Sequence, residues 1–132
     1  MEQVGMVSLW AGRADSARAL NAYLQAGYTE DGDYVPSSFA KYFGIGYYDD
    51  DCLESRYRAE SSRNVSELLK GHSYDAAIIE ALNNLIGFDF PLDVNAVVLL
   101  YDFRHDSGVE AGHDGTVRLR YMGAVAFSKI RP

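Results

Sequence analysis

The stretch AVVLLYDF, residues 96–103, decides the fold of this 132-residue chain. Its apolar residues run from Ala96 to Tyr101 on both alternating faces, which is typical of a strand buried on both sides of a sheet. A glycine-rich loop, residues 105–115, follows it. Beyond that loop, residues 116–128 alternate between apolar side chains and arginines. We expect strands 96–103 and 116–128 to pair as an antiparallel hairpin.

Outward from this pair, the sequence predicts two more strands and four helices. Residues 4–10 form a buried strand that Gly12 is expected to end, and residues 52–58 form another. Apolar residues at helical spacing, with serines and glycines at the ends, predict helices over 15–25, 37–43, 65–70 and 74–86. Ser73 is expected to cap the last of them. The fold class is therefore α+β, a mainly antiparallel sheet packed against helices. The length fits a single domain, residues 1–132.

Composition excludes several classes of partner. The formal net charge is −7 with a sequence pI near 4.8, which disfavours nucleic acid and anionic membranes as ligands. One cysteine, Cys52, leaves no intrachain disulfide. The N-terminus has no signal-peptide pattern, and the longest apolar run is too short to span a bilayer. We expect a cytoplasmic protein that is a monomer or a weak homodimer.

Negative charge is concentrated between Glu30 and Glu54. This segment has seven acidic residues and one basic residue, Lys41, so it carries −6 of the total charge of −7. Tyrosines lie among the acids, and tyrosine beside carboxylates is typical of a surface that binds a basic partner. The other interpretation places the rings in the core and the acids on a solvated rim. The candidate partner-binding residues are Glu30, Asp31, Asp33, Tyr34, Tyr47, Tyr48, Asp49, Asp50, Asp51 and Glu54.

The residues that could support catalysis are few. Neither acidic cluster has the spacing of an EF-hand loop, and the glycines do not form a phosphate-binding loop. Cys52 follows three aspartates, which would raise its thiol pKa. His105-Asp106 and His113-Asp114 flank the glycine-rich loop without a matching third zinc ligand. We therefore expect no catalytic residue, no cofactor and no metal. A small metal-dependent hydrolase using Asp and His residues, or a general protein-binding adaptor, remains the alternative.

Several segments resemble the immunity protein 22 family of bacterial polymorphic toxin systems. They begin with VSLWAG at residues 7–12 and LNAYL at residues 20–24. Similar segments continue along nearly the full length of the chain: YTEDGD (28–33), PSSF (36–39), FGIGYYD (43–49), SELL (66–69), SY (73–74), NAVVLLYDF (95–103) and YMG (121–123). The resemblance implies an α+β immunity protein that binds and neutralises a secreted toxin in the cell that makes it.

The acidic segment and the resemblance lead to one functional hypothesis. The acidic, tyrosine-rich surface, with Trp10 nearby, binds a basic domain of a cognate toxin. If the toxin is a nuclease, clustered carboxylates could occupy its nucleic-acid groove in place of phosphates. Alternatively, Trp10 is a buried residue that anchors the core. Asp102 could cap the end of its strand or pair with Arg118 or Arg120.

Overall fold

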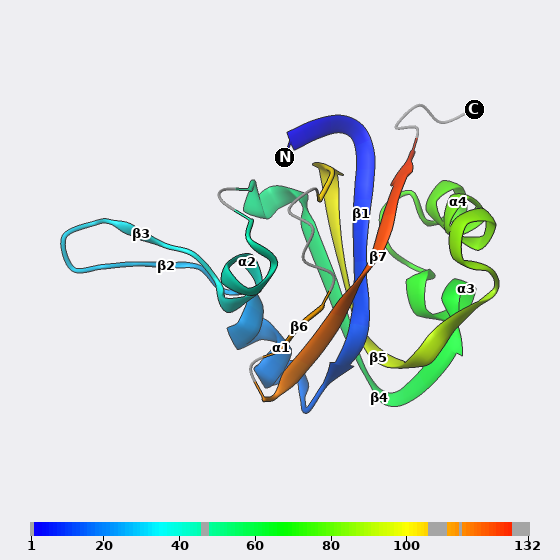
Figure 1. The fold of residues 1–132 in the computed structure, drawn as a ribbon, viewed down its shortest axis with the longest axis horizontal. Helices are drawn as coiled ribbons and strands as arrows, with labels where there is room; N and C mark the ends of the chain where they lie inside the picture. Colours follow the sequence, from blue (N-terminus) through cyan, green and yellow to red (C-terminus); the bar gives the residue numbers. More distant parts are fainter. Residues whose placement is uncertain (1, 46–47, 106–110, 114, 128–132) are drawn as a thin grey trace.

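The sheet is the centre of the fold. The computed structural model describes residues 2–45, 48–105, 111–113 and 115–127. Five antiparallel strands lie in the order β4-β5-β1-β7-β6 (Figure 1). Their bounds are β1 Glu2–Ala14, β4 Leu53–Asn64, β5 Asp89–Phe103, β6 Ala111–His113 and β7 Val117–Ala126. Two short strands, β2 (Gly27–Tyr28) and β3 (Tyr34–Val35), form a separate hairpin.

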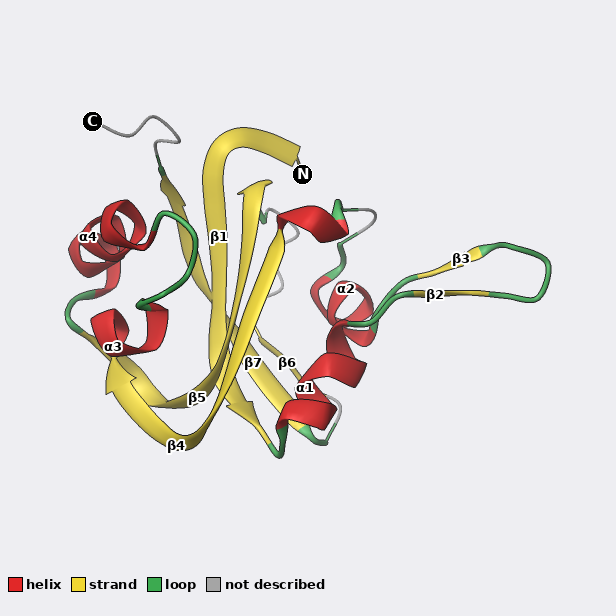
Figure 2. Cartoon of the chain, turned by 180° about the vertical axis from the view of Figure 1, so that it is seen from behind, coloured by secondary structure: helices red, strands yellow, loops and turns green. Residues whose placement is uncertain are grey.

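Helices cover both faces of the sheet (Figure 2). Helices α1 (Ala17–Leu24) and α2 (Ser38–Phe43) pack on one face, and α3 (Val65–Leu69) and α4 (Asp75–Ile86) pack on the other. A short 3₁₀ helix, η1 (Asp50–Cys52), leads into β4. Alternating residues of β5 enter opposite cores, because successive side chains of a strand point to opposite faces. Val98 and Leu100 lie under α1 and α2, whereas Val97 and Leu99 lie under α3 and α4. The predicted α+β class is confirmed.

Local capping sets the helix boundaries. The side chains of Ser16, Ser37 and Asn64 accept hydrogen bonds from backbone N–H groups in the first turns of α1, α2 and α3. The expected cap at Ser73 is wrong. Tyr74, with φ of 58°, holds the N-cap position of α4 without a side-chain cap, and the Ser73 hydroxyl is bonded to Glu54 instead.

The expected hairpin between residues 96–103 and 116–128 is also wrong. Strand β1 lies between β5 and β7 and pairs with both, Leu9 facing Leu99 on one side and Gly123 on the other. Strand β5 is therefore an interior strand, as its apolar faces indicate. The physical reason is that β1 forms hydrogen bonds along both of its edges. It therefore satisfies backbone N–H and C=O groups of β5 and of β7 at once.

Gly12 does not end β1, contrary to the expectation from sequence. The strand continues to Ala14, and the backbone of β7 lies close against Gly12. A Cβ atom placed on Gly12 would lie 1.9 Å from the carbonyl oxygen of Arg118 and 2.9 Å from its carbon. A glycine inside a strand often marks such a close backbone approach.

Candidate partner-binding site

The β2–β3 hairpin forms an arm that extends away from the body of the protein (Figures 1 and 2). We call residues 27–35 the arm. Gly27 pairs with Val35 and Tyr28 with Tyr34. The loop is closed by Thr29, whose N–H donates to the Asp33 carbonyl at 2.8 Å and whose hydroxyl accepts from the Asp33 N–H at 3.1 Å. Asp31-Gly32, a sequence typical of turns, thus lies at the tip of a hairpin.

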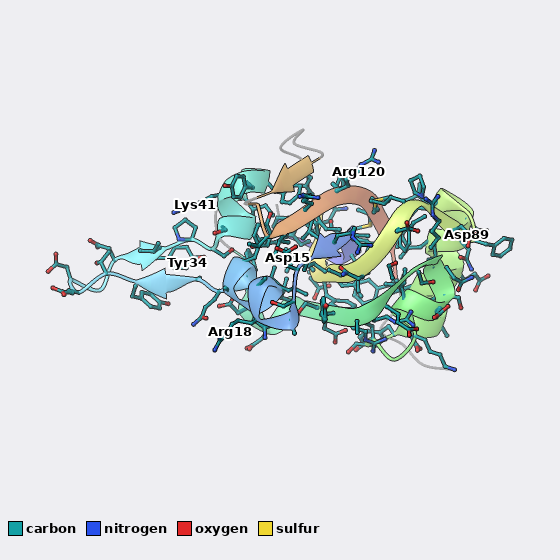
Figure 3. All side chains as sticks on the ribbon, turned by 90° about the horizontal axis from the view of Figure 1, so that it is seen from below. Asp15, Arg18, Tyr34, Lys41, Asp89 and Arg120 are labelled. Carbon is teal, nitrogen blue, oxygen red and sulfur yellow. The ribbon has the colours of Figure 1, made fainter. Side chains whose placement is uncertain are left out.

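Three of the candidate acids lie at the tip of this arm. Glu30, Asp31 and Asp33 are exposed, and no ion pair or hydrogen bond engages their carboxylates within the part of the chain that the structure describes. Tyr34 is 37% exposed, and its ring meets that of Tyr28 edge to face, with centroids 6.0 Å apart. Figure 3 shows the arm, with Tyr34 labelled, beyond the rest of the molecule. The arm therefore presents two rings and three unpaired carboxylates.

Asp49, Asp50 and Asp51 form a second exposed group, at η1. The Asp49 side chain caps this helix by accepting a hydrogen bond from the Asp51 N–H at 3.0 Å. Helix η1 and the arm both lie on the α1–α2 side of the sheet, but the arm carries its tip away from η1 (Figure 2). The two exposed groups of acids thus lie at two places on one side of the molecule.

Two of the candidate aromatic residues are in the core instead of at the surface. Tyr48 is only 5% exposed, and burial raises the pKa of its phenol. Trp10 is fully buried, with its ring centroid 4.8 Å from that of Phe39, which agrees with the core-anchor interpretation. Tyr47 lies outside the described residues. Of the two candidate tyrosines that the structure describes, Tyr34 in the arm is accessible and Tyr48 is not.

Glu54 lies on the other face of the sheet, where it holds the α3–α4 connection in place. Its Oε1 atom accepts hydrogen bonds from the Ser73 N–H at 3.0 Å, from His72 Nδ1 at 3.1 Å and from the Tyr101 hydroxyl at 3.1 Å. Oε2 accepts from the Ser73 hydroxyl. Although partial burial raises the pKa of Glu54, these hydrogen bonds outweigh it and lower the pKa overall. This carboxylate is engaged inside the protein.

Replacing Glu54 with alanine is expected to destabilise the fold by about 2 kcal/mol at neutral pH, because several donors lose their acceptor. Burial lowers the pKa of His72, and hydrogen bonds lower that of Glu54, so the unfolded chain binds more protons than the folded one. Stability should be full above the ordinary imidazole pKa of 6.5. It should fall as His72 and then Glu54 take up protons, the latter below the ordinary carboxyl pKa of 4.5.

Urea unfolding of the wild type and the Glu54→Ala variant at about pH 7.5, 5.5 and 4 measures this dependence. The exposed Glu60, in the same strand, gives the control variant Glu60→Gln. Equal stability of Glu54→Ala and Glu60→Gln at neutral pH would show that the network contributes nothing.

Of the two His-Asp sequences beside the glycine-rich loop, the structure describes the side chain of His105. His105 is buried, and its ring packs against those of Trp10 and Tyr121. Asp106 and Asp114 lie outside the described residues. No group of three or more His, Cys, Asp or Glu side chains that could hold a metal ion occurs in residues 3–45, 48–105 and 115–127. In the same residues, no helix is both long and apolar enough to cross a membrane.

The prediction from sequence missed one residue of the arm, Tyr28. It is 75% exposed, the most exposed tyrosine of the arm, yet it is absent from the predicted binding residues. Its position opposite Tyr34 follows only from the pairing of β2 with β3. The signal in the sequence is one tyrosine on each side of an Asp-Gly turn.

By its fold, the chain is an α+β protein with an antiparallel sheet covered by helices on both faces. A family model described as Immunity protein 22 matches residues 7–128, and the chain belongs to that family. No curated protein and no solved structure matches it. Family membership supports an immunity role, which implies the binding of a cognate toxin.

Proposed function

We propose that this immunity protein neutralises its toxin by binding a basic surface of the toxin through the arm and η1. The arm contributes Glu30, Asp31, Asp33 and Tyr34 together with Tyr28, and η1 contributes Asp49, Asp50 and Asp51. Glu54 and Tyr48 support the fold behind this surface. The observation that carries the proposal is the extension of the arm from the body, with unpaired carboxylates at its tip.

The low stability expected of such a hairpin by itself supports a binding role for the arm. An isolated two-stranded hairpin is marginally stable in water, and the arm has only two pairs of facing strand residues. Like charges at its tip repel each other, by about 1 kcal/mol per close pair in water. A partner with lysines or arginines would remove that repulsion and would cover the exposed rings of Tyr28 and Tyr34.

A nuclease is the class of toxin that this surface fits best. The groove of a nuclease is positively charged, because it must bind phosphates. Carboxylates on a narrow arm could enter such a groove and occupy phosphate positions. The toxin is then inhibited because its nucleic-acid substrate can no longer enter the groove.

Co-expression tests the immunity role itself. The toxin domain encoded beside this gene is expressed in a sensitive bacterial strain, with and without the immunity protein. Growth should be restored only when both are made. If growth stays arrested although soluble immunity protein is present, the chain does not neutralise that toxin. A protein recovered with an unrelated host partner would support the adaptor alternative instead.

Neutralising the arm tests the contact surface. The triple variant Glu30→Gln, Asp31→Asn, Asp33→Asn should weaken toxin binding by roughly 30-fold at low salt, because charges across an interface speed association and pair with the partner. The difference from the wild type should shrink as ionic strength rises, since salt screens exposed charges. Isothermal titration calorimetry at two salt concentrations measures both effects.

The matched control removes three exposed carboxylates elsewhere: Glu60→Gln, Glu80→Gln, Asp89→Asn. Figure 3 places Asp89 at the end of the molecule opposite the arm. This control has the same net charge as the arm variant. If both variants bind the toxin equally well, total charge and not the arm governs the affinity.

A further inference from the structure

The two strands of the arm form a sheet of their own, so each has an outer edge that pairs with no other strand of the described residues. In an antiparallel pair, facing residues alternate between pairs that exchange backbone hydrogen bonds and pairs that do not. Thr29 and Asp33 face each other as a bonded pair, because the Thr29 N–H donates to the Asp33 carbonyl at 2.8 Å. Tyr28 and Tyr34, the neighbouring pair in the register, are then a non-hydrogen-bonded pair. The backbone N–H and C=O groups of Tyr28 therefore point to the outer edge of β2.

The two edges of the arm differ in what they offer to another strand. Continued by one pair beyond Gly27 and Val35, the register places Ala26 opposite Pro36. This is again a non-hydrogen-bonded pair, so the backbone nitrogen of Pro36 belongs to the outer edge of β3. Proline has no N–H to donate, and it is one of the residues that keep edge strands from pairing. The β2 edge has an N–H at both Ala26 and Tyr28, so it is the edge that another strand can join.

The β2 edge is also accessible. Tyr28 is 75% exposed, and the arm projects from the body of the protein (Figures 1 and 2). A hairpin of two strands is marginally stable by itself, whereas three strands with an apolar face can be stable. The rings of Tyr28 and Tyr34, with centroids 6.0 Å apart, give the arm one aromatic face. A third strand would extend a sheet that already has a face for its side chains.

We propose that the β2 edge of the arm pairs with an exposed edge strand of the toxin, so that the arm and the toxin form one continuous sheet. This inference rests on the proposed function, because the toxin supplies the strand. In strand addition, main-chain hydrogen bonds give affinity and the neighbouring side chains give specificity. A strand beside Tyr28 runs along the arm to its tip, where lysines or arginines of the toxin meet Glu30 and Asp31. A second copy of this chain is a less suitable occupant, because two copies of charge −7 repel each other.

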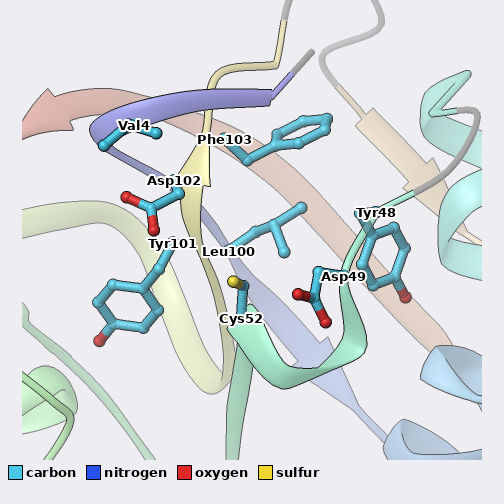
Figure 4. Close-up of a pocket in the computed structure, with 8 residues that line it drawn as sticks. All are labelled: Val4, Tyr48, Asp49, Cys52, Leu100, Tyr101, Asp102 and Phe103. Carbon is cyan, nitrogen blue, oxygen red and sulfur yellow. The ribbon is translucent and has the colours of Figure 1, made fainter.

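The other part of the proposed surface, η1, offers side chains and no strand edge. Its three residues, Asp50–Cys52, form a 3₁₀ turn that the Asp49 side chain caps. Figure 4 shows Asp49 and Cys52 in the wall of the pocket beside the end of β5. Contacts of the η1 carboxylates should weaken as salt rises, because salt screens exposed charges, whereas backbone hydrogen bonds at β2 join uncharged groups. This difference makes η1 an internal control.

The test compares the full-length variants Tyr28→Pro and Tyr28→Ala in their affinity for the toxin domain encoded beside this gene. Both variants lose the aromatic ring, but only proline lacks the N–H that points to the β2 edge. Tyr28→Pro should bind at least about tenfold more weakly than Tyr28→Ala, because an acceptor of the toxin strand is left unpaired. This ratio should persist at high salt, whereas the effect of Asp50→Asn should shrink. Both Tyr28 variants should melt within about 3 °C of the wild type, since both cores are built from other elements.

Hydrogen exchange of the wild type gives a measurement that needs no variant. The Tyr28 amide should exchange at least about tenfold more slowly in the toxin complex than in the free protein, because it donates to the toxin strand. Pro36→Ala is the control for the opposite edge, where it restores an N–H. It should bind the toxin within about twofold of the wild type, because the toxin strand lies on β2.

The outcomes separate this inference from the proposed function. If the wild type does not bind the toxin at all, the proposed function fails. If the wild type binds, but Tyr28→Pro binds within about twofold of Tyr28→Ala and the Tyr28 amide exchanges at an unchanged rate, the function stands and strand pairing at β2 is overturned. A dimer in analytical ultracentrifugation of the free protein, with the Tyr28 amide already protected, would place a second copy on this edge and would also overturn the inference.

Discussion

Replacing Gly12 with alanine is expected to destabilise the protein by about 4 kcal/mol, because overpacked and strained sites account for the largest effects of single substitutions. The new Cβ atom would lie 1.9 Å from a backbone carbonyl oxygen, that of Arg118. No side-chain rotation can relieve this contact, so β1 and β7 must separate. These strands hold the two cores together, and total stabilities are only about 5–15 kcal/mol. Thermal denaturation should show a melting temperature lowered by roughly 10–20 °C.

Gly27→Ala is the matched control. Gly27 also lies in a strand, and a Cβ atom placed there meets nothing within 4 Å. It should change the free energy of unfolding by about 0.5 kcal/mol or less, as surface substitutions usually do. A Gly12→Ala variant that melts within about 2 °C of this control would contradict the close approach of β7, since 1 kcal/mol corresponds to several degrees in a domain of this size.

Excision of the arm is expected to abolish protection against the toxin and to leave the fold intact. Gly27 and Val35 face each other across the hairpin, so residues 28–34 can be replaced by Asn-Gly, which forms a two-residue hairpin turn. The body should keep its stability, because both cores are built from other elements. Toxin affinity should fall by at least about 100-fold, which corresponds to roughly 3 kcal/mol.

Two measurements decide the outcome of the excision. Thermal melts should agree with the wild type within about 3 °C, an energy of under roughly 1 kcal/mol. Co-expression with the toxin should give no rescue of growth. A second control keeps the arm at full length and changes only Tyr28→Ser and Tyr34→Ser. It separates the effect of losing the two rings from the effect of shortening the arm. If the protein without the arm still protects fully, the arm is not part of the binding surface.

The sequence by itself determines the four helices, four strands of the sheet and the family, but not β2, β3 and β6. The predicted strands near 4–10, 52–58, 96–103 and 116–128 each correspond to a strand of the sheet, and each predicted helix corresponds to one of α1–α4. Apolar periodicity and capping act within a few residues, so they can be read without tertiary information. Ser37 and Gly44, at the two ends of α2, are examples. The resemblance to the immunity family is confirmed by the match over residues 7–128.

Only the tertiary structure decides which strands are neighbours and where the acids lie. Insertion of β1 between β5 and β7 depends on pairing between residues far apart in the sequence, such as Leu9 and Leu99, which are 90 positions apart. Acids that are close in sequence separate because the chain between Glu30 and Glu54 forms a projecting hairpin, a helix and the start of an edge strand. Glu54 then faces His72, Ser73 and Tyr101, whereas the arm faces solvent. Charge density along a chain does not fix charge density on a surface, because the fold sets the direction of each side chain.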